Sequence, residues 1–160
     1  MGILKFRQQI VAPSFQSGNN VMLASADVTI TSAQLLALFA APRPIVAAPG
    51  VGKALIFDSA IVMHPAGTAY AAVAVGDDIA IKYTDATGLT VGSCETTGFL
   101  DAATAQTRYI RAYAAASSVS DITQVANAAL VIQILLTEVT TGTFPLYVRT
   151  FYRVLPTTLP

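Results

Sequence analysis

The chain has 160 residues, of which 54% are hydrophobic and 11% are charged. An average soluble domain carries about 25% charged residues, so this chain has much apolar surface for its charge. Nine basic and nine acidic side chains cancel. We therefore predict no nucleic-acid partner, because no basic surplus is available to neutralise phosphates. We predict no membrane partner either, because no apolar run approaches the ~18 residues of a spanning helix.

The length predicts one domain with a core large enough to need no covalent staples. Residues 1–20 mix charged, amide, Pro and Gly residues with isolated apolar ones. They predict an extended N-terminal arm, with one strand around residues 4–11. Two interpretations of the arm are open: a frayed terminus, or a segment that docks on a neighbouring subunit. We assign residues 21–160 to a single domain. Amides and a proline interrupt the apolar stretch of a secretory signal, so we expect no leader to be removed.

The first regular element after the arm is predicted to be a short helix at about residues 32–40. Thr31 and Gln34 form a capping-box pattern. Leu35 and Leu38 then fall at helical spacing, and Pro42 ends the helix because the residue before proline disfavours helical backbone. A helix of this length is unstable alone, so we expect it to cover an open end of the fold.

The rest of the chain predicts strands. Period-two alternation and β-branched residues mark them, with Gly, Asp and Pro turns between. The last two strands are predicted to pair as an antiparallel hairpin with Gly142 near the turn. Helices and strands do not alternate, which argues against a parallel α/β sheet. We predict an all-β fold, an antiparallel β-sandwich, of which the jelly-roll is one form. The predicted strands cover residues 54–63, 78–84, 107–113, 129–137 and 146–154.

The final predicted strand has two dissimilar faces. One face is aliphatic, whereas the other alternates Tyr147 and Phe151 with Arg149 and Arg153. This second face is either buried under another layer of the same chain or forms a subunit interface, where aromatic and Arg side chains are enriched. The high apolar content favours the interface.

The residues that catalysis would require are scarce. The single histidine, His64, follows Asp58 by six residues in one predicted strand, which separates them by roughly 20 Å. We therefore expect a surface or turn histidine, no catalytic residues and no enzyme.

Metal and phosphate sites are also not predicted. Cys94 has no second cysteine or nearby histidine at zinc spacing, so we expect a buried free thiol. Asp77, Asp78 and Asp85 lack the spacing of a calcium loop, so we expect solvated turns. Residues 49–53 lack the Ser or Thr of a phosphate-binding loop, so we expect a tight turn. We predict no metal and no cofactor.

The order of these features resembles that of small structural proteins of tailed bacteriophages, some of which resemble capsid decoration, or cement, proteins. The similarity covers roughly residues 30–155 and does not include residues 1–20. It is carried by turn and strand punctuation, in the segments 31–36 (TSAQLL), 44–53 (PIVAAPGVGK), 54–63, 67–70, 79–83, 127–132 and 146–154.

This resemblance implies a virion structural protein, made in the host cytoplasm and located on the capsid surface. The leading hypothesis is a cement protein that binds the outer shell of a tailed-phage head and stabilises it through subunit-bridging contacts. Its partners would be the major capsid protein and further copies of the chain, as a homotrimer. The residues that we expect at the interface are Phe6 and Arg7 in the arm, with Tyr147, Arg149, Phe151 and Arg153 in the last strand.

Two other hypotheses remain open. The first is a phage tail or fibre module that binds a host-surface glycan, with Tyr70, Tyr83 and Tyr109 as the candidate aromatic contacts. The second is a small secreted lectin-like domain, which the missing signal peptide disfavours.

Overall fold

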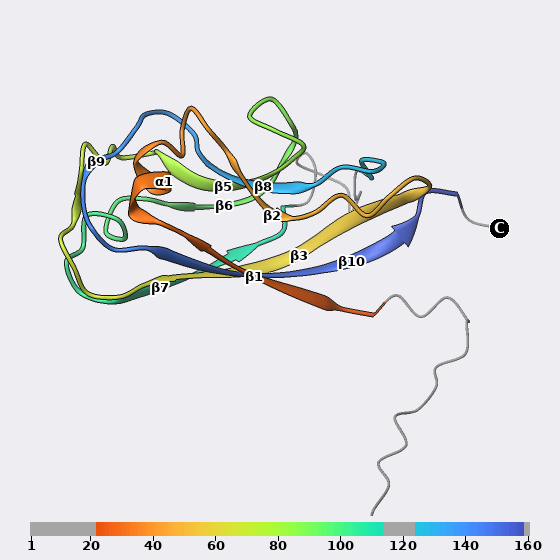
Figure 1. The fold of residues 1–160 in the computed structure, drawn as a ribbon, viewed down its shortest axis with the longest axis horizontal. Coiled ribbons are helices and arrows are strands. Elements are labelled where there is room, and N and C mark those ends of the chain that lie inside the picture. Colours follow the sequence, from red (N-terminus) through yellow and green to blue (C-terminus); the bar gives the residue numbers. More distant parts are fainter. Residues whose placement is uncertain (1–21, 114–123, 159–160) are drawn as a thin grey trace, which may run out of the picture.

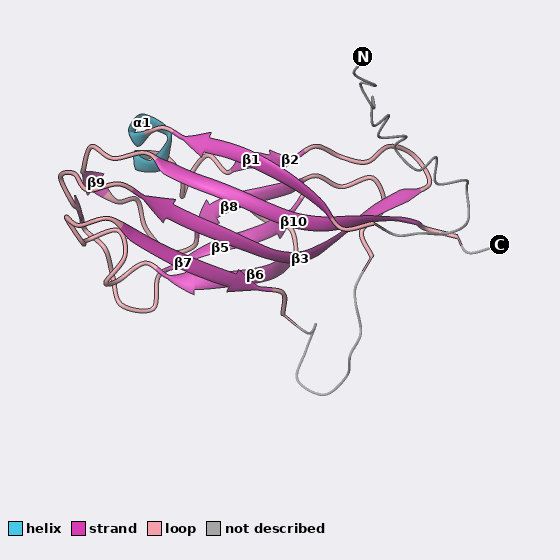
Figure 2. Cartoon of the chain, turned by 90° about the horizontal axis from the view of Figure 1, so that it is seen from below, coloured by secondary structure: helices cyan, strands magenta, loops and turns pink. Residues whose placement is uncertain are grey.

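Two four-stranded antiparallel sheets face each other in the computed structural model, which describes residues 22–113 and 124–158 (Figures 1 and 2). The first sheet has the order β1 (Ala24–Ile30), β10 (Leu146–Pro156), β3 (Lys53–His64) and β7 (Gln106–Arg111). The second sheet has the order β2 (Arg43–Val46), β8 (Leu130–Ile134), β5 (Asp78–Tyr83) and β6 (Thr90–Glu95). A small third sheet pairs β4 (Tyr70–Ala71) with β9 (Thr140–Thr141). The predicted all-β sandwich is confirmed, whereas the predicted arm at residues 1–20 lies outside the described residues.

The pairing of the eight longer strands is nested. The first of them pairs with the last, β1 with β10, and the second with the seventh, β2 with β8. The third pairs with the sixth, β3 with β7, and the two central ones, β5 and β6, pair with each other. The chain therefore crosses repeatedly from one sheet to the other, and most sequence neighbours lie on opposite sides of the core.

The predicted hairpin between residues 129–137 and 146–154 is wrong. Strand β8 pairs with β2 and β5 in the second sheet, whereas β10 pairs with β1 and β3 in the first. Both strands have an apolar face, and these faces meet across the core instead of lying side by side. Alternation reports that one face of a strand is buried, and it does not say which strand is the neighbour.

Strand β8 ends earlier than predicted because of a buried carboxylate. Asp77 Oδ1 accepts hydrogen bonds from the backbone N–H groups of Leu135 and Leu136 at 3.1 and 2.9 Å, and Oδ2 accepts from Thr137 N–H at 3.3 Å. Leu135 N–H also donates to the Asp78 carbonyl of β5 at 3.1 Å, so the carboxylate replaces a neighbouring strand as the acceptor at Leu136 and Thr137. Leu136, inside the predicted strand 129–137, lies in a bend and is exposed. The expectation of a solvated Asp77 is also wrong, because its side chain is fully buried.

The capping box of the helix is confirmed. Thr31 Oγ1 accepts from Gln34 N–H at 3.3 Å, and Thr31 N–H donates to Gln34 Oε1 at 2.9 Å. Helix α1 spans only Ser32–Leu36, shorter than the predicted 32–40, and turns follow it. The carboxylate of Glu138 accepts from the backbone N–H groups of residues 39 and 40, which holds these turns at one end of the sandwich. In the described part of the chain, no helix is long and apolar enough to cross a membrane.

The core fills the space between the sheets. The first sheet contributes Val62, Ile110 and Val148, and the second contributes Ile81 and Ile132. All of these side chains are buried. The opposite sides of the two sheets differ, and this difference positions the candidate site.

Candidate interaction surface

The side of the first sheet that faces away from the core is here called the outer face. Strand alternation turns Val28, Val62 and Val148 inward, and it turns their neighbours along each strand outward. The ladder register then aligns the outward residues of four strands into three rows. The rows are Thr29–Tyr147–Met63–Thr107, Asp27–Arg149–Ile61–Tyr109 and Ser25–Phe151–Ser59–Arg111.

The outer face exposes large side chains. Tyr109 is 54% exposed, Tyr147 43% and Met63 38%. Ile61 and Phe151 beside them are half-buried. Isolated exposed apolar residues are ordinary, but a contiguous group of them marks a binding or interaction surface.

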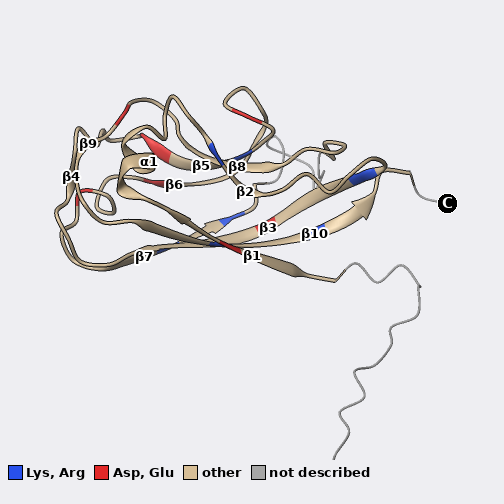
Figure 3. Ribbon diagram, viewed as in Figure 1, with Lys and Arg blue, Asp and Glu red and all other residues tan. Residues whose placement is uncertain are grey.

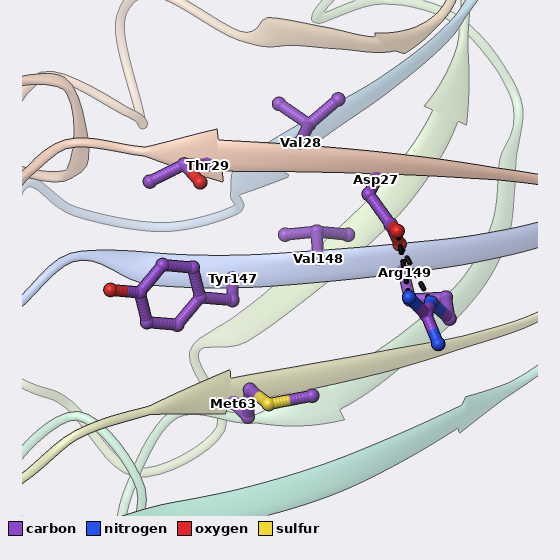
Figure 4. A pocket seen from close by; sticks show the side chains of 7 residues that line it. All are labelled: Asp27, Val28, Thr29, Met63, Tyr147, Val148 and Arg149. Carbon is purple, nitrogen blue, oxygen red and sulfur yellow. Dashed lines mark hydrogen bonds and ion pairs between the residues drawn. The ribbon is translucent and has the colours of Figure 1, made fainter.

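An ion pair crosses the middle row of the outer face. Arg149 donates from Nε to Asp27 Oδ1 and from Nη2 to Asp27 Oδ2, both at 2.7 Å (Figure 4). The bidentate bond from Arg149 lowers the pKa of the Asp27 carboxyl, and the same pairing raises the pKa of Arg149. Two parallel bonds hold the guanidinium in one orientation, so this part of the face presents a fixed surface.

Two further arginines lie on or beside the outer face. Arg153 Nη2 lies 3.3 Å from Asp58 Oδ1, next to the bulge at which β3 holds one extra residue. The Arg111 guanidinium lies 5.8 Å from the centre of the Tyr109 ring, a cation–π contact. Among the described residues Arg111 has no carboxylate partner.

Tyr147 and Met63 form a ridge between two hollows. One hollow, of about 310 Å³, is lined by the ridge together with Asp27, Thr29 and Arg149 (Figure 4). The other, of about 320 Å³, lies on the far side of the ridge, against Pro65 and Gln106. A partner surface with side chains that enter both hollows would contact the ridge from two sides.

Comparisons with known proteins add little to this geometry. No protein-family model and no curated protein matches the chain. In structure, the chain is similar to a chain described as "Cyanophage Pam1 capsid asymmetric unit", with a TM-score of 0.48 and 17% sequence identity. The similarity covers 92% of this chain and 94% of that one. At this identity and TM-score the similarity assigns neither a family nor a role to this chain.

The structure brings the predicted interface residues of the last strand together. Tyr147, Arg149 and Phe151 share the outer face, and Arg153 follows them on the same strand. Phe6 and Arg7 lie outside the described residues. Sequence reasoning missed the neighbours that complete the face from β1, β3 and β7, namely Asp27, Ile61, Met63, Tyr109 and Arg111. The alternation of β1 was a usable signal, but the register that aligns these residues is not visible in the sequence.

The three glycan-contact tyrosines are not brought together. Tyr70 and Tyr83 are buried, so their assignment to a binding surface is wrong. Tyr70 OH donates to the Phe144 carbonyl at 2.7 Å, and burial raises the pKa of Tyr70 to about 12. Tyr83 OH donates to the Leu55 carbonyl at 2.6 Å, and burial raises its pKa as well. Of these three tyrosines, only Tyr109 is exposed.

His64 is buried, so the expectation of a surface or turn histidine is wrong. Its ring stacks on Phe144 with centroids 3.9 Å apart and planes at 10°, and it is tilted against Phe99. Nδ1 lies 2.8 Å from the Pro65 carbonyl oxygen, and Nε2 lies 2.9 Å from that of Phe99. Both ring nitrogens therefore face backbone carbonyl oxygens of the protein.

The remaining polar candidates are dispersed. Cys94 is a partly buried free thiol, and burial raises its pKa to about 12. Asp85 is exposed as expected, and its pKa is lowered because Thr87 donates to it from both its hydroxyl and its N–H group. Within residues 22–113 and 124–158, no three His, Cys, Asp or Glu side chains are close enough to hold a metal ion.

Proposed function

We propose that this chain is a virion structural protein that acts as a capsid decoration, or cement, protein on the outer shell of a tailed-phage head. The observation that supports this proposal is the outer face of the first sheet. It displays Tyr, Met and Arg side chains from β3, β7 and β10, and the described part of the chain leaves them exposed. The role is mechanical, with no catalysis and no cofactor.

The composition of the outer face is that of a protein interface. Interface cores are enriched in aromatic residues, Met and Arg, and depleted of Lys and Glu. Tyr109, Tyr147 and Met63 provide the apolar contacts, and Arg149 is held in place by Asp27. The nested strand order is also the one expected of a jelly-roll, an architecture that viral capsid and lectin domains share.

The size of the outer face favours binding by several copies at once. Four strands and three rows cover about 19 Å by about 20 Å, or about 400 Å², which is half of the roughly 800 Å² per partner in a standard interface. One copy would therefore bind weakly, whereas linked copies gain avidity because the second binding event is intramolecular. We propose that a homotrimer supplies these linked copies and bridges capsid subunits.

The alternative is a tail or fibre module that binds a host-surface glycan. Two of its three candidate tyrosines are buried, so Tyr109 alone supports it. Nothing else among the described residues adds to this reading.

Electron microscopy of virions that carry a tagged copy of the protein tests the proposal. The expected result is label distributed over the head shell. Label at the tail tip would contradict the proposal and support the glycan-binding alternative.

The contribution of the arm is tested separately. Deletion of residues 2–18 should lower the occupancy on heads, because we propose that the arm adds a strand to an exposed sheet edge of a neighbour. Undiminished occupancy would remove the arm from the mechanism and leave the outer face in place.

A further inference from the structure

The exposed cations of residues 22–113 and 124–158 lie on one sheet. Among the described residues, the exposed Lys and Arg side chains all belong to β3, β7 and β10. Figure 3 marks the positions of all described Lys and Arg residues, exposed or buried, on the ribbon. They are Lys53, Arg111, Arg149 and Arg153. Outside the first sheet the described cations are Arg43, which is half-buried, and Lys82, which is buried.

The carboxylates have the opposite distribution. In the described residues, the first sheet holds five cations and two carboxylates, a net charge of +3, whereas the rest holds two cations and six carboxylates, a net charge of −4. The six carboxylates outside the first sheet are Asp77, Asp78, Asp85, Glu95, Asp101 and Glu138.

The two carboxylates of the first sheet are already paired. Asp27 is held by Arg149 and Asp58 by Arg153. Arg111 lies over Tyr109 at the β7 edge of the outer face. The outer face therefore offers a cation without a partner, and the described residues supply no free carboxylate to it.

We propose that the outer face docks on an acidic protein surface of the capsid shell, with Arg111 paired to a carboxylate of that surface. This inference rests on the proposed function and adds the sign of the partner and the orientation of the protein. Tyr147 and Met63 make the apolar contact, and the second sheet, which has no net charge, faces away from the shell. Complementary charge steers association and fixes orientation. The same face of a second copy would bring the same net positive charge, which disfavours it as the occupant.

The test compares two variants of equal net charge on phage heads stripped of this protein. Arg111→Glu removes a positive charge from the outer face and adds a negative one. The control, Val75→Glu with Ala86→Glu, makes the same change of two charges at exposed positions outside the first sheet. We expect Arg111→Glu to weaken binding to the heads about tenfold at low salt and the control to weaken it less than about threefold. Circular dichroism of each variant checks that the fold is intact.

Salt dependence of the unmodified protein gives a second readout that needs no variant. Binding should weaken as the salt concentration rises from about 0.05 M to about 0.5 M, because screening shortens the range of the attraction. Equal binding by Arg111→Glu and the control, or binding independent of salt, would overturn the inference. So would an Arg111→Glu variant that loses self-association but binds heads normally, because the outer face would then join copies of the chain. If the unmodified protein does not bind heads at all, the proposed function fails instead.

Discussion

Strands β8 and β10 differ in their second faces, the faces that point away from the core. Every residue of β8 is buried, so both faces of this strand are covered. The amide of Gln133, on the side away from the core, donates to the Phe39 carbonyl, which shows that a neighbouring segment closes that side. Strand β10 alternates buried with exposed residues from Leu146 to Thr150. The described chain therefore covers both faces of β8, whereas it leaves one face of β10 exposed.

The largest contrast is expected from placing a charge on each of these second faces. Val131→Asp on β8 should cost at least about 3 kcal/mol or prevent folding, because the new carboxylate is buried without a partner. Tyr147→Asp on β10 should cost less than about 1 kcal/mol, because the site is open to water. Urea unfolding measures both free energies. Similar losses in the two variants would show that the faces do not differ in burial.

The carboxylate that ends β8 is expected to have the next largest effect. Asp77→Ala should lower the free energy of unfolding by about 2–4 kcal/mol, because the backbone N–H groups of Leu136 and Thr137 lose their acceptor, whereas Leu135 N–H keeps the Asp78 carbonyl. The matched control is Asp85→Ala in an exposed turn, which should change stability much less. The prediction fails if the two alanine variants have the same urea midpoint.

A glycine in the loop between β9 and β10 provides a smaller test. Gly142 has φ of +79°, and a Cβ atom there would lie 2.4 Å from the Tyr70 ring. Gly142→Ala should therefore cost roughly 2–3 kcal/mol, from backbone strain plus the clash. Gly76 has nearly the same φ, +81°, with nothing near the added atom, so Gly76→Ala carries only the backbone strain of about 1 kcal/mol. Equal melting temperatures for the two variants would show that the contact with the Tyr70 ring adds no destabilisation.

The smallest effect is expected from the ion pair on the outer face. Because Arg149 lowers the pKa of Asp27 in the folded state, the pair stabilises the fold above the ordinary carboxyl pKa of about 3.9. That stabilisation is lost as the pH falls through the lowered pKa. Asp27→Asn should therefore be slightly less stable than the unmodified protein at neutral pH and equal to it in strong acid. Urea midpoints across the pH range measure the difference, and a constant difference would contradict the assignment.

The sequence predicts what each strand buries better than which strands are neighbours. Alternation in residues 146–154 placed Tyr147, Arg149 and Phe151 on one face, and the Thr31–Gln34 pattern located the helix start, because both signals are local. The predicted hairpin was wrong because pairing is decided across the whole chain. Met63, Tyr109 and Arg111 join the outer face only through the ladder register.

The sequence also does not predict the burial of two polar residues, His64 and Asp77. His64 contacts Phe99 and Phe144, and Asp77 binds the backbone of residues 135–137, all of them distant in the sequence. A polar residue near a turn usually meets water, and only its tertiary partners make these two exceptions.

Occupancy of Tyr147→Asp on stripped phage heads tests the central claim most directly. The ridge residue is exposed, so the variant should retain the stability of the unmodified protein. We predict that it loses most of its binding to heads, while Val75→Asp, which makes the same change of charge at an exposed loop position, binds normally. A folded Tyr147→Asp variant that occupies heads as fully as the unmodified protein would contradict the assignment of the outer face as the docking surface.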